Sequence, residues 1–253
     1  MNYKDKFYSK YVSVHTSRLY GEIFLGDIKR QFPVWQKYFG RFLPEDKKAK
    51  IIDLGCGNGG FVYWLQQIGY QNAEGIDISA EQIETGQKLG IKNIKQADIK
   101  EFLITQLPNN YDVIFMRDIL EHFNKEEVID ILDFIYASLK QNGRFICQTV
   151  NAENLLWGRL RHGDFTHELA FTEDSIRQIL RLIGFQNISV YAQRPVIHGL
   201  KSLIRAVLWK YIELEIKFYL LIETGSAKGI FTQNLIAVAY KTENRNWLGE
   251  SRK

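Results

Sequence analysis

The 253-residue sequence has few cysteines and no long apolar run. Its two cysteines, Cys56 and Cys147, stand at unrelated positions, which excludes a disulfide framework and fits a reducing compartment. No uninterrupted apolar stretch approaches the roughly 20 residues of a membrane-spanning helix. The first six residues also lack an apolar signal core. We therefore expect a cytoplasmic protein.

The sequence also lacks a basic surplus over most of its length. Residues 1–50 hold eleven Lys or Arg against five Asp or Glu, whereas the remaining residues hold 22 against 24. No stacked-aromatic RNA signature is present, so we expect no nucleic-acid partner. The basic N-terminal segment either faces an anionic substrate or lipid surface or forms a solvated helical cap, and we favour the cap.

The composition, with 45% hydrophobic and 25% charged residues, is typical of a globular protein, and the length suits one large α/β domain. Strands are predicted at 49–53, 72–77, 93–97, 111–117, 143–150, 186–193 and 230–240, with helices at 59–69, 80–89, 100–106 and 125–140. Strands that alternate with helices indicate βαβ units and a parallel sheet covered on both faces. A further helix is predicted to begin after Thr172 as N-cap and to end at Gly184.

The remaining segments flank this sheet core, which comprises residues 49–193 and 230–240. Residues 1–48 are rich in Tyr and Phe, and the spacing from about His15 to Phe42 predicts two helices broken near Pro33. Residues 194–229 are predicted to form a helical lid or insertion. Residues 241–253 read as a polar tail.

A glycine-rich turn follows the first predicted strand. Gly55, Gly57 and Gly60 satisfy the dinucleotide pattern G-x-G-x-x-G, which is weak evidence by itself. Asp53 lies two residues before the first of these glycines, where it would repel a pyrophosphate and suits a ligand with a positive group. An NAD(P)-dependent oxidoreductase stays as an alternative.

The sequence resembles class I S-adenosyl-L-methionine (SAM)-dependent methyltransferases in a series of motifs spread over residues 49–150. The residues that carry the resemblance are Asp53–Gly59 (D-L-G-C-G-N-G), Gly75–Ser79, Ala97–Ile99, Asp112–Ile114, Arg117–His122 and Leu139–Arg144. The last of these lacks the proline and one glycine of the usual L-K-P-G-G turn. The resemblance implies a Rossmann-like seven-stranded sheet of order 3-2-1-4-5-7-6 with an antiparallel last strand.

The resemblance also implies roles for the glycine turn. Gly55, Gly57 and Gly59 would let the loop lie against the methionine part of SAM. Asp53 would lie near the cationic end of that ligand. Cys56 would be a small buried side chain beside the cofactor, since free cysteines mostly behave as small hydrophobes.

The next two strands would complete the cofactor site. The resemblance implies that Asp77 accepts hydrogen bonds from both ribose hydroxyls, because a carboxylate can take two at once. Asp98 would accept the adenine amino group, with Ile78 and Ile99 packed on the ring faces. Arg117, at the end of the fourth strand, is placed in the same site.

The acceptor side calls for a general base near the electrophilic methyl group if the acceptor is a hydroxyl. His167 is the favoured candidate and His122 the second, with Asp164, Thr166 and Asn151 as substrate-binding residues. The D-x-T-H run and the F-T-E-x-S that follows it resemble methyltransferases of surface-polysaccharide and glycan biosynthesis. No His, Cys or carboxylate cluster has metal-ligand spacing, so we expect no metal.

Residues 197–222 form a broad apolar helical surface with interspersed lysines. This segment could lie in a membrane interface, although we favour a lid or a homodimer contact packed against the N-terminal cap. The leading function is O-methylation of a sugar or glycan hydroxyl. The alternatives are a small-molecule methyltransferase for phenols, quinone precursors or secondary metabolites, the oxidoreductase, and a SAM-binding protein without catalysis.

Overall fold

A computed structural model describes residues 3–8, 10 and 23–242. The predictions for His15, for the beginning of the first N-terminal helix and for the tail after residue 242 lie outside these residues. The helices are α1 (Tyr3–Tyr8), α3 (Leu25–Phe39), α4 (Gly60–Gln67), α5 (Ala80–Lys88), α6 (Ile99–Ile104), α7 (Lys125–Ser138), α8 (Trp157–Arg161), α9 (Glu173–Ile183) and α10 (Leu200–Thr224), with short 3-10 helices η2 (Gly40–Phe42) and η3 (Leu120–His122). The strands are β1 (Ile51–Leu54), β2 (Ala73–Asp77), β3 (Ile94–Gln96), β4 (Tyr111–Arg117), β5 (Leu139–Val150), β6 (Gln186–Ala192) and β7 (Asn234–Tyr240).

The seven strands form one sheet in the order β3-β2-β1-β4-β5-β7-β6, which confirms the predicted topology. The first five strands pair in parallel, and β7 runs antiparallel to both β5 and β6. Asp53 of β1 lies opposite Gly75 of β2 and Phe115 of β4. Because parallel strands end at the same edge of a sheet, the residues that follow β1, β2 and β4 gather at one edge, where ligands of such sheets bind.

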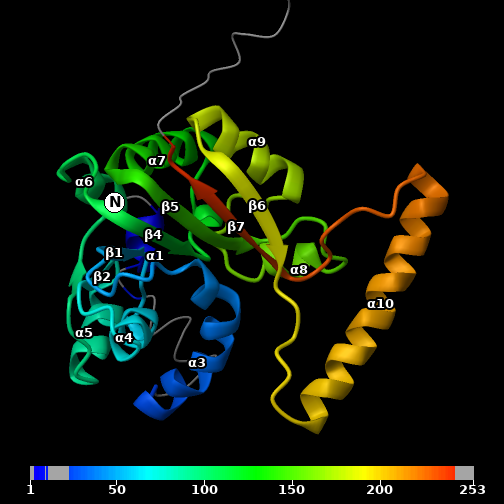
Figure 1. Cartoon of the computed structure of the whole chain (residues 1–253), viewed down its shortest axis with the longest axis horizontal. Helices are drawn as coiled ribbons and strands as arrows, with labels where there is room; N and C mark the ends of the chain where they lie inside the picture. Colours follow the sequence, from blue (N-terminus) through cyan, green and yellow to red (C-terminus); the bar gives the residue numbers. More distant parts are fainter. Residues whose placement is uncertain (1–2, 9, 11–22, 243–253) are drawn as a thin grey trace, which may run out of the picture.

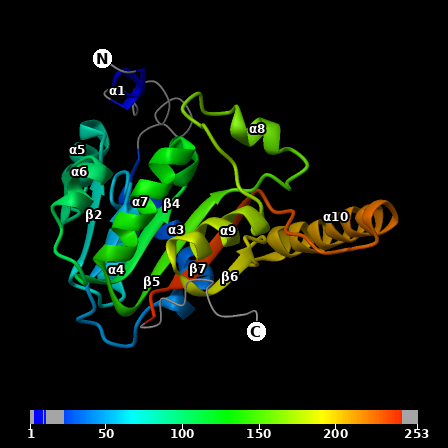
Figure 2. The same ribbon diagram turned by 90° about the horizontal axis from the view of Figure 1, so that it is seen from above.

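Helices cover both faces of this sheet (Figures 1 and 2). One hydrophobic cluster contains Leu132 of α7, Leu180 of α9 and Phe145 of β5. The other contains Phe39 of α3 and Phe61 of α4, whose rings meet edge to face at 5.4 Å. These two apolar layers hold the strands in place, so the edge that carries the ends of β1, β2 and β4 is rigidly positioned.

The predicted helix break near Pro33 is wrong, because α3 continues from Leu25 through Pro33 to Phe39. A proline inside a helix removes one backbone hydrogen bond and crowds the preceding turn. Aromatic packing on α4 offsets this cost: the ring of Trp35 meets Phe61 at 5.5 Å, and Phe39 meets the same ring. The tertiary contacts therefore override the local preference.

The ends of α9 confirm the capping prediction. The Thr172 side chain accepts a hydrogen bond from the Ser175 N–H, and the helix ends at Gly184 with φ of 109°. The strand predicted at 143–150 begins earlier, at Leu139, because the chain leaves α7 directly into the sheet and Leu139 pairs with Tyr111 of β4.

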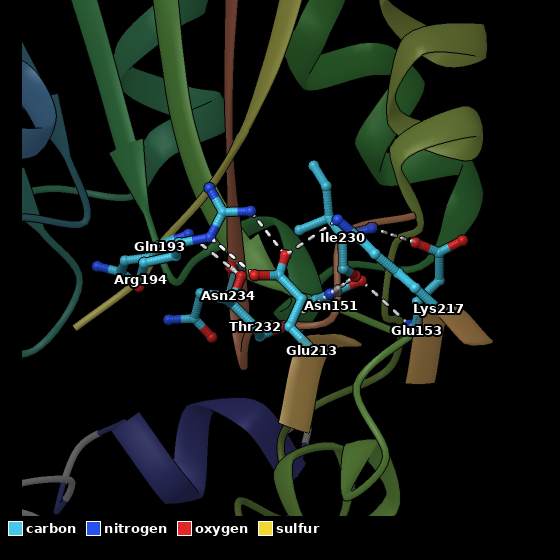
Figure 3. Close-up of polar contacts among 9 residues, drawn as sticks. All are labelled: Asn151, Glu153, Gln193, Arg194, Glu213, Lys217, Ile230, Thr232 and Asn234. Atoms are coloured by element: carbon cyan, nitrogen blue, oxygen red, sulfur yellow. Dashed lines mark hydrogen bonds and ion pairs between the residues drawn. The ribbon is translucent and has the colours of Figure 1, made fainter. Parts of the chain in front are cut away.

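Helix α10 stands apart from the rest of the domain (Figures 1 and 2). Its buried residues are Ser202 and Glu213. Glu213 is held by Arg194 at 2.6 Å and by Lys217 at 3.8 Å (Figure 3). Among residues 3–8, 10 and 23–242, no helix is both long and apolar enough to cross a membrane.

Asn151 joins the end of β5 to the segment that returns from α10 (Figure 3). Its side-chain N–H groups donate to the carbonyl oxygens of Ile230 and Thr232, and its backbone N–H donates to Gln233. The side-chain oxygen accepts from the Glu153 N–H at 3.0 Å. The residue is completely buried, so its amide is used to close the fold.

Replacing this amide by a carboxylate tests that role. Asn151→Asp removes both side-chain donors and places a charge opposite two carbonyl oxygens, so we expect a loss of about 2–4 kcal/mol in the free energy of unfolding. For a chain of this size, thermal unfolding followed by circular dichroism should show Tm lowered by roughly 5–15 °C. The control is Asn72→Asp at an exposed position, and equal Tm values for the two variants would contradict the assignment.

Candidate functional site

A cavity of about 360 Å³ opens at the sheet edge where β1, β2 and β4 end. The residues that line it are Tyr8, Gly55, Gly57, Asp77, Ile78, Ser79, Gln82, Asp98, Ile99, Arg117, Asp118, Ile119, His122, Phe123 and Glu127. Seven of these residues were predicted from the sequence to bind the cofactor, and His122 was predicted for the acceptor. No residue of α10 is among them, and the lid role of this helix stays a prediction.

The glycine turn forms one wall of the cavity. Gly55 has φ of +75° and Gly57 has φ of +56°, a region that residues with a side chain rarely adopt. A Cβ at Gly55 would lie 2.3 Å from the Ile119 side chain. Gly59, at φ of +77°, packs against Ile94 outside the cavity. Its predicted contact with the methionine part of SAM therefore has no counterpart in the lining.

The Asp77 carboxylate lies at the end of β2 and is anchored at both oxygens. Oδ2 accepts from the Gly57 N–H at 2.8 Å, and Oδ1 accepts from the Ser79 N–H at 2.8 Å. Burial raises the pKa of Asp77, and these two hydrogen bonds oppose the increase. Each oxygen retains a second lone pair for a ligand hydroxyl.

The far end of the cavity combines an acid with apolar surfaces. Asp98 caps α6 by accepting a hydrogen bond from the Glu101 N–H at 2.9 Å, which fixes its carboxylate at the cavity wall. Ile78 is partly exposed and Ile99 is buried, and both line the cavity. This arrangement suits a flat heterocycle held between two apolar side chains, with one polar edge facing the acid.

Asp53 and Arg117 form a buried ion pair behind the cavity. The two side chains meet at 3.0 Å, and Asp53 is completely buried. Burial raises the pKa of Asp53, which the Arg117 charge opposes. Only Arg117 reaches the lining, and its guanidinium packs over the Phe61 ring at 4.0 Å. Cys56 is buried beside them outside the lining, where burial raises the pKa of its thiol.

Asp118 lines the cavity and was not singled out from the sequence, although it opens the D-x-L-E-H run. Its backbone is in the left-handed region at φ of +56°. The carboxylate accepts from the Gln148 amide at 2.6 Å and from the Asn234 amide at 3.1 Å. Loss of solvation in the surrounding protein raises the pKa of Asp118 to about 6, and the Arg117 charge opposes this increase. The side chain nevertheless opens onto the cavity. A non-glycine residue in this conformation favours a functional interpretation.

His122 lies on the cavity wall at the end of a hydrogen-bonded chain. Its Nδ1 lies 2.8 Å from Thr166 Oγ1, and that hydroxyl donates to Asp164 Oδ1 at 2.7 Å. A hydroxyl has one proton, so Thr166 must accept from His122 Nδ1–H, which leaves Nε2 as the unprotonated nitrogen of the neutral ring. Asp164 and Thr166 are buried outside the lining. The structure thus places these two predicted substrate-binding residues behind His122.

His167 lies behind His122. Its Nδ1 faces the Leu160 carbonyl at 2.9 Å, and its ring meets the His122 ring edge to face at 4.7 Å. The two segments are joined because the N–H groups of Glu168 and Leu169 both donate to the Glu121 carbonyl. Of the two predicted bases, only His122 is part of the lining.

The fold also brings together three candidate metal ligands. One ligand atom from each of His122, Asp164 and His167 lies within 4.8 Å of the others, a spacing that could hold an ion. The sequence concealed this cluster because 42 residues separate its two segments. Residue spacing along the chain gave no sign of this spatial grouping, and the absence of a metal stays a prediction.

Glu121 is a buried acid beneath this region. Its Oε2 accepts from the Thr149 hydroxyl at 2.8 Å, and Oε1 has no hydrogen-bond partner among the described residues. Burial, with a smaller contribution from the Asp118 charge, raises the pKa of Glu121 to about 8. The folded protein therefore keeps this carboxyl protonated at neutral pH.

The strand order, the glycine turn, the acid at the end of β2 and the acid that follows β3 define the fold of class I SAM-dependent methyltransferases. A family model described as a methyltransferase domain matches residues 28–190. This match covers more than half of the chain, so the protein belongs to that family.

Several known proteins are similar to this chain. The uncharacterized protein RP028 of Rickettsia prowazekii is 28% identical over 162 residues, which is 61% of this chain and 65% of that protein. Phosphoethanolamine N-methyltransferase of Plasmodium falciparum is 24% identical over 103 residues, 40% of this chain and 39% of that enzyme. The chain thus spans less than two thirds of these curated relatives. A solved SAM-dependent methyltransferase from Archaeoglobus fulgidus has a TM-score of 0.63 at 19% identity, covers 83% of this chain and 94% of its own, and supports the fold.

The contribution of the glycine turn to ligand binding can be tested by adding a single methyl group at Gly55. Gly55→Ala places a Cβ against Ile119 at an unfavourable φ, so we expect affinity for S-adenosylhomocysteine to fall at least about tenfold. Isothermal titration calorimetry measures this change. Gly90→Ala is the matched control, because Gly90 has φ of +78° and nothing within 4 Å of the added atom. Equal affinities for the two variants would show that the turn does not shape the site.

The raised pKa of Glu121 predicts that the free energy of unfolding depends on pH. Its pKa is higher folded than unfolded, so its contribution to stability falls as pH rises from about 4.5 to about 8. Glu121→Gln removes this loss. At pH 8 we expect the free energy of unfolding to rise by at least the equivalent of one pKa unit, about 1.4 kcal/mol, which raises Tm by roughly 3–6 °C.

The gain from Glu121→Gln should shrink toward pH 4.5 in thermal unfolding experiments. Glu45→Gln, at an exposed position, serves as the control and should show no such trend. A Glu121→Gln variant that is less stable than the wild type at pH 8 would refute the buried neutral acid.

Proposed function

We propose that the protein transfers the methyl group of SAM to a small polar acceptor, and most specifically to a sugar or glycan hydroxyl. The observation that carries this proposal is His122 at the cavity wall, with Nδ1 bound to Thr166 and Thr166 bound to Asp164. These two hydrogen bonds direct the proton-accepting nitrogen of His122 away from Thr166. A hydroxyl acceptor requires such a base, because it must lose its proton as it is methylated.

The residues of the cavity fit the cofactor. Asp77 would accept the ribose hydroxyls with the lone pairs that Gly57 and Ser79 leave. Asp98 would accept the adenine amino group, and Ile78 and Ile99 would contact the ring. When bound, SAM supplies a methyl group made electrophilic by its sulfonium sulfur.

His122 would act on the acceptor. Its Nε2 takes the proton of the acceptor hydroxyl as the oxygen gains the methyl group, and the ring becomes an imidazolium. Asp118 lines the same cavity and is ionised above about pH 6. Its negative charge stabilises that imidazolium. Asp164, through Thr166, keeps the ring in the required orientation.

The charges of the cavity bear on the class of acceptor. Among the described lining residues, Arg117 is the one permanent cation, and Asp53 pairs with it. Asp77, Asp98, Asp118 and Glu127 contribute carboxylates to the same lining. Asp77 and Asp98 are assigned to the cofactor, so Asp118 and Glu127 remain for the acceptor, and they favour a neutral or cationic group at the methylated position.

A small-molecule amine is the second candidate. The relative from Plasmodium falciparum is a phosphoethanolamine N-methyltransferase, and the carboxylates around the cavity would attract an ammonium group. A methyl-transfer assay with labelled SAM separates the two classes. The acceptors to compare are nucleotide sugars and lipid-linked glycans, simple phenols, and ethanolamine with phosphoethanolamine. Transfer to the amines alone would overturn the hydroxyl proposal.

The assignment of the base is tested with three variants. We expect His122→Ala to lower kcat by about 10²–10⁴-fold. Thr166→Val removes the acceptor for Nδ1–H and should lower kcat about tenfold. His167→Ala should cost less than His122→Ala, because His167 lies behind the cavity wall. Affinity for S-adenosylhomocysteine, measured in parallel, should stay within about threefold of wild type if the site is intact.

Other outcomes of these measurements would favour a different base or a different class of protein. A large loss with His167→Ala and a small one with His122→Ala would identify His167 as the base. Tight S-adenosylhomocysteine binding without transfer to any acceptor would favour a non-catalytic SAM-binding protein. Tight NADH binding would favour the oxidoreductase.

A further inference from the structure

Helix α10 carries a regular apolar row that nothing in the described chain covers. The row consists of Leu200, Ile204, Val207, Tyr211, Leu214, Phe218 and Leu221, which we call the seam. The spacing along it alternates between four and three residues. Every seam side chain exposes at least half of its surface, from 50% at Leu221 to 73% at Leu200.

The seam faces away from the domain. With 3.6 residues per turn, Ser202 and Glu213 lie close to one another on the helix circumference and roughly opposite Tyr211. Ser202 and Glu213 are the residues that α10 buries, and Arg194 holds Glu213 from the domain side. Figure 1 shows the helix standing clear of the sheet, with its outer side directed to solvent.

The period of the seam indicates the kind of partner. Apolar residues repeating every 3.5 positions over three heptads are typical of a coiled coil, in which the seam of one helix packs into that of another. A helix that lies in a membrane interface needs a broad apolar face bordered by cations. Exposed Leu208 and Tyr219 widen the apolar face beyond the seam, but the exposed carboxylate of Glu215 lies within that face. An anionic lipid surface would have to bury this charge, which disfavours it.

The charges beside the seam favour a second copy in parallel orientation. Leu203 and Lys210 lie on one flank of the seam, and Leu208 and Glu215 lie on the other. In a parallel pair, each residue of the first flank faces the residue five positions later on the partner helix. Lys210 would then face Glu215 of the second copy, and Leu203 would face Leu208. An antiparallel pair brings together residues of the same flank, which sets Lys210 against Lys210 or Lys217. Lys210 and Glu215 therefore attract each other in the parallel pair, whereas the antiparallel pair sets Lys210 against another lysine.

We propose that α10 is a dimerisation helix, whose seam pairs with that of a second copy of this chain in a parallel two-stranded coiled coil. This pairing removes the exposed apolar row from water, which is favourable in proportion to the apolar area covered. It leaves the cavity of each protomer accessible, because α10 contributes nothing to the lining. The proposal does not depend on the identity of the methyl acceptor.

The oligomeric state of the full chain provides the first test. Sedimentation equilibrium at micromolar concentration should give the mass of two copies. Leu214→Glu places two charges in the centre of the seam and should weaken association at least about 100-fold. Ile212→Glu is the matched control, since Ile212 is an exposed apolar residue of the same helix outside the seam, with 42% of its surface exposed against 64% for Leu214. This control should remain dimeric, and circular dichroism should show both variants folded.

Two further variants test the orientation. Lys210→Glu should weaken the dimer about tenfold by placing like charges opposite one another, and adding Glu215→Lys should restore it. Val207→Cys should form a disulfide with its own copy under mild oxidation, because equivalent seam residues face each other only in a parallel pair. The two natural cysteines are buried and do not compete.

Three results would overturn the proposal. The first is a monomer at about 100 µM, well above the dissociation constants of stable dimers. The second is binding of the monomer to vesicles of anionic phospholipid that Leu214→Glu abolishes, which would assign the seam to a membrane surface. The third is a dimer that Leu214→Glu leaves unchanged, which would place the interface elsewhere.

Discussion

Three hydrogen bonds tie the glycine turn to the end of β2, and the rest of the site depends on them. The N–H groups of Gly55 and Cys56 donate to the Ile76 carbonyl at 2.9 and 2.8 Å, and the Gly57 N–H donates to the Asp77 carboxylate. The turn can make these bonds because Gly55 and Gly57 adopt positive φ. It thereby sets the distance between β1 and β2 at the sheet edge and holds the acid that a ribose would meet.

A second set of contacts builds the acceptor side from residues far apart in the chain. The Glu121 carbonyl accepts two backbone N–H groups from residues 168 and 169, which brings the 164–167 loop against η3. Thr166 and Asp164 then orient His122 at the cavity wall. The same elements bury Glu121 as a neutral acid, so the site combines a positioned base with groups whose pKa values the protein raises. Helix α10 lies outside this arrangement, and Arg194 holds it through Glu213.

Much of the fold was predictable because it follows from short-range patterns. The alternation of strands and helices, the Thr172 cap and the glycine at 184 are local signals, and the ordered motifs indicated the strand order. The error at Pro33 arose because aromatic packing between α3 and α4 outweighs the local cost of the proline. Much of the cavity lining was also predictable, since Gly55, Gly57, Asp77 and Asp98 each lie at or just after the end of a strand.

The sequence by itself determined the sheet, the glycine turn and the apolar row of α10, because each of these depends on neighbouring residues and their period. Only the tertiary structure decided which residues meet across the chain. It placed His122 on the cavity wall with His167 behind it, used Asn151 to close the fold, and left the seam of α10 facing solvent. These outcomes depend on contacts between segments tens of residues apart, which no local pattern encodes.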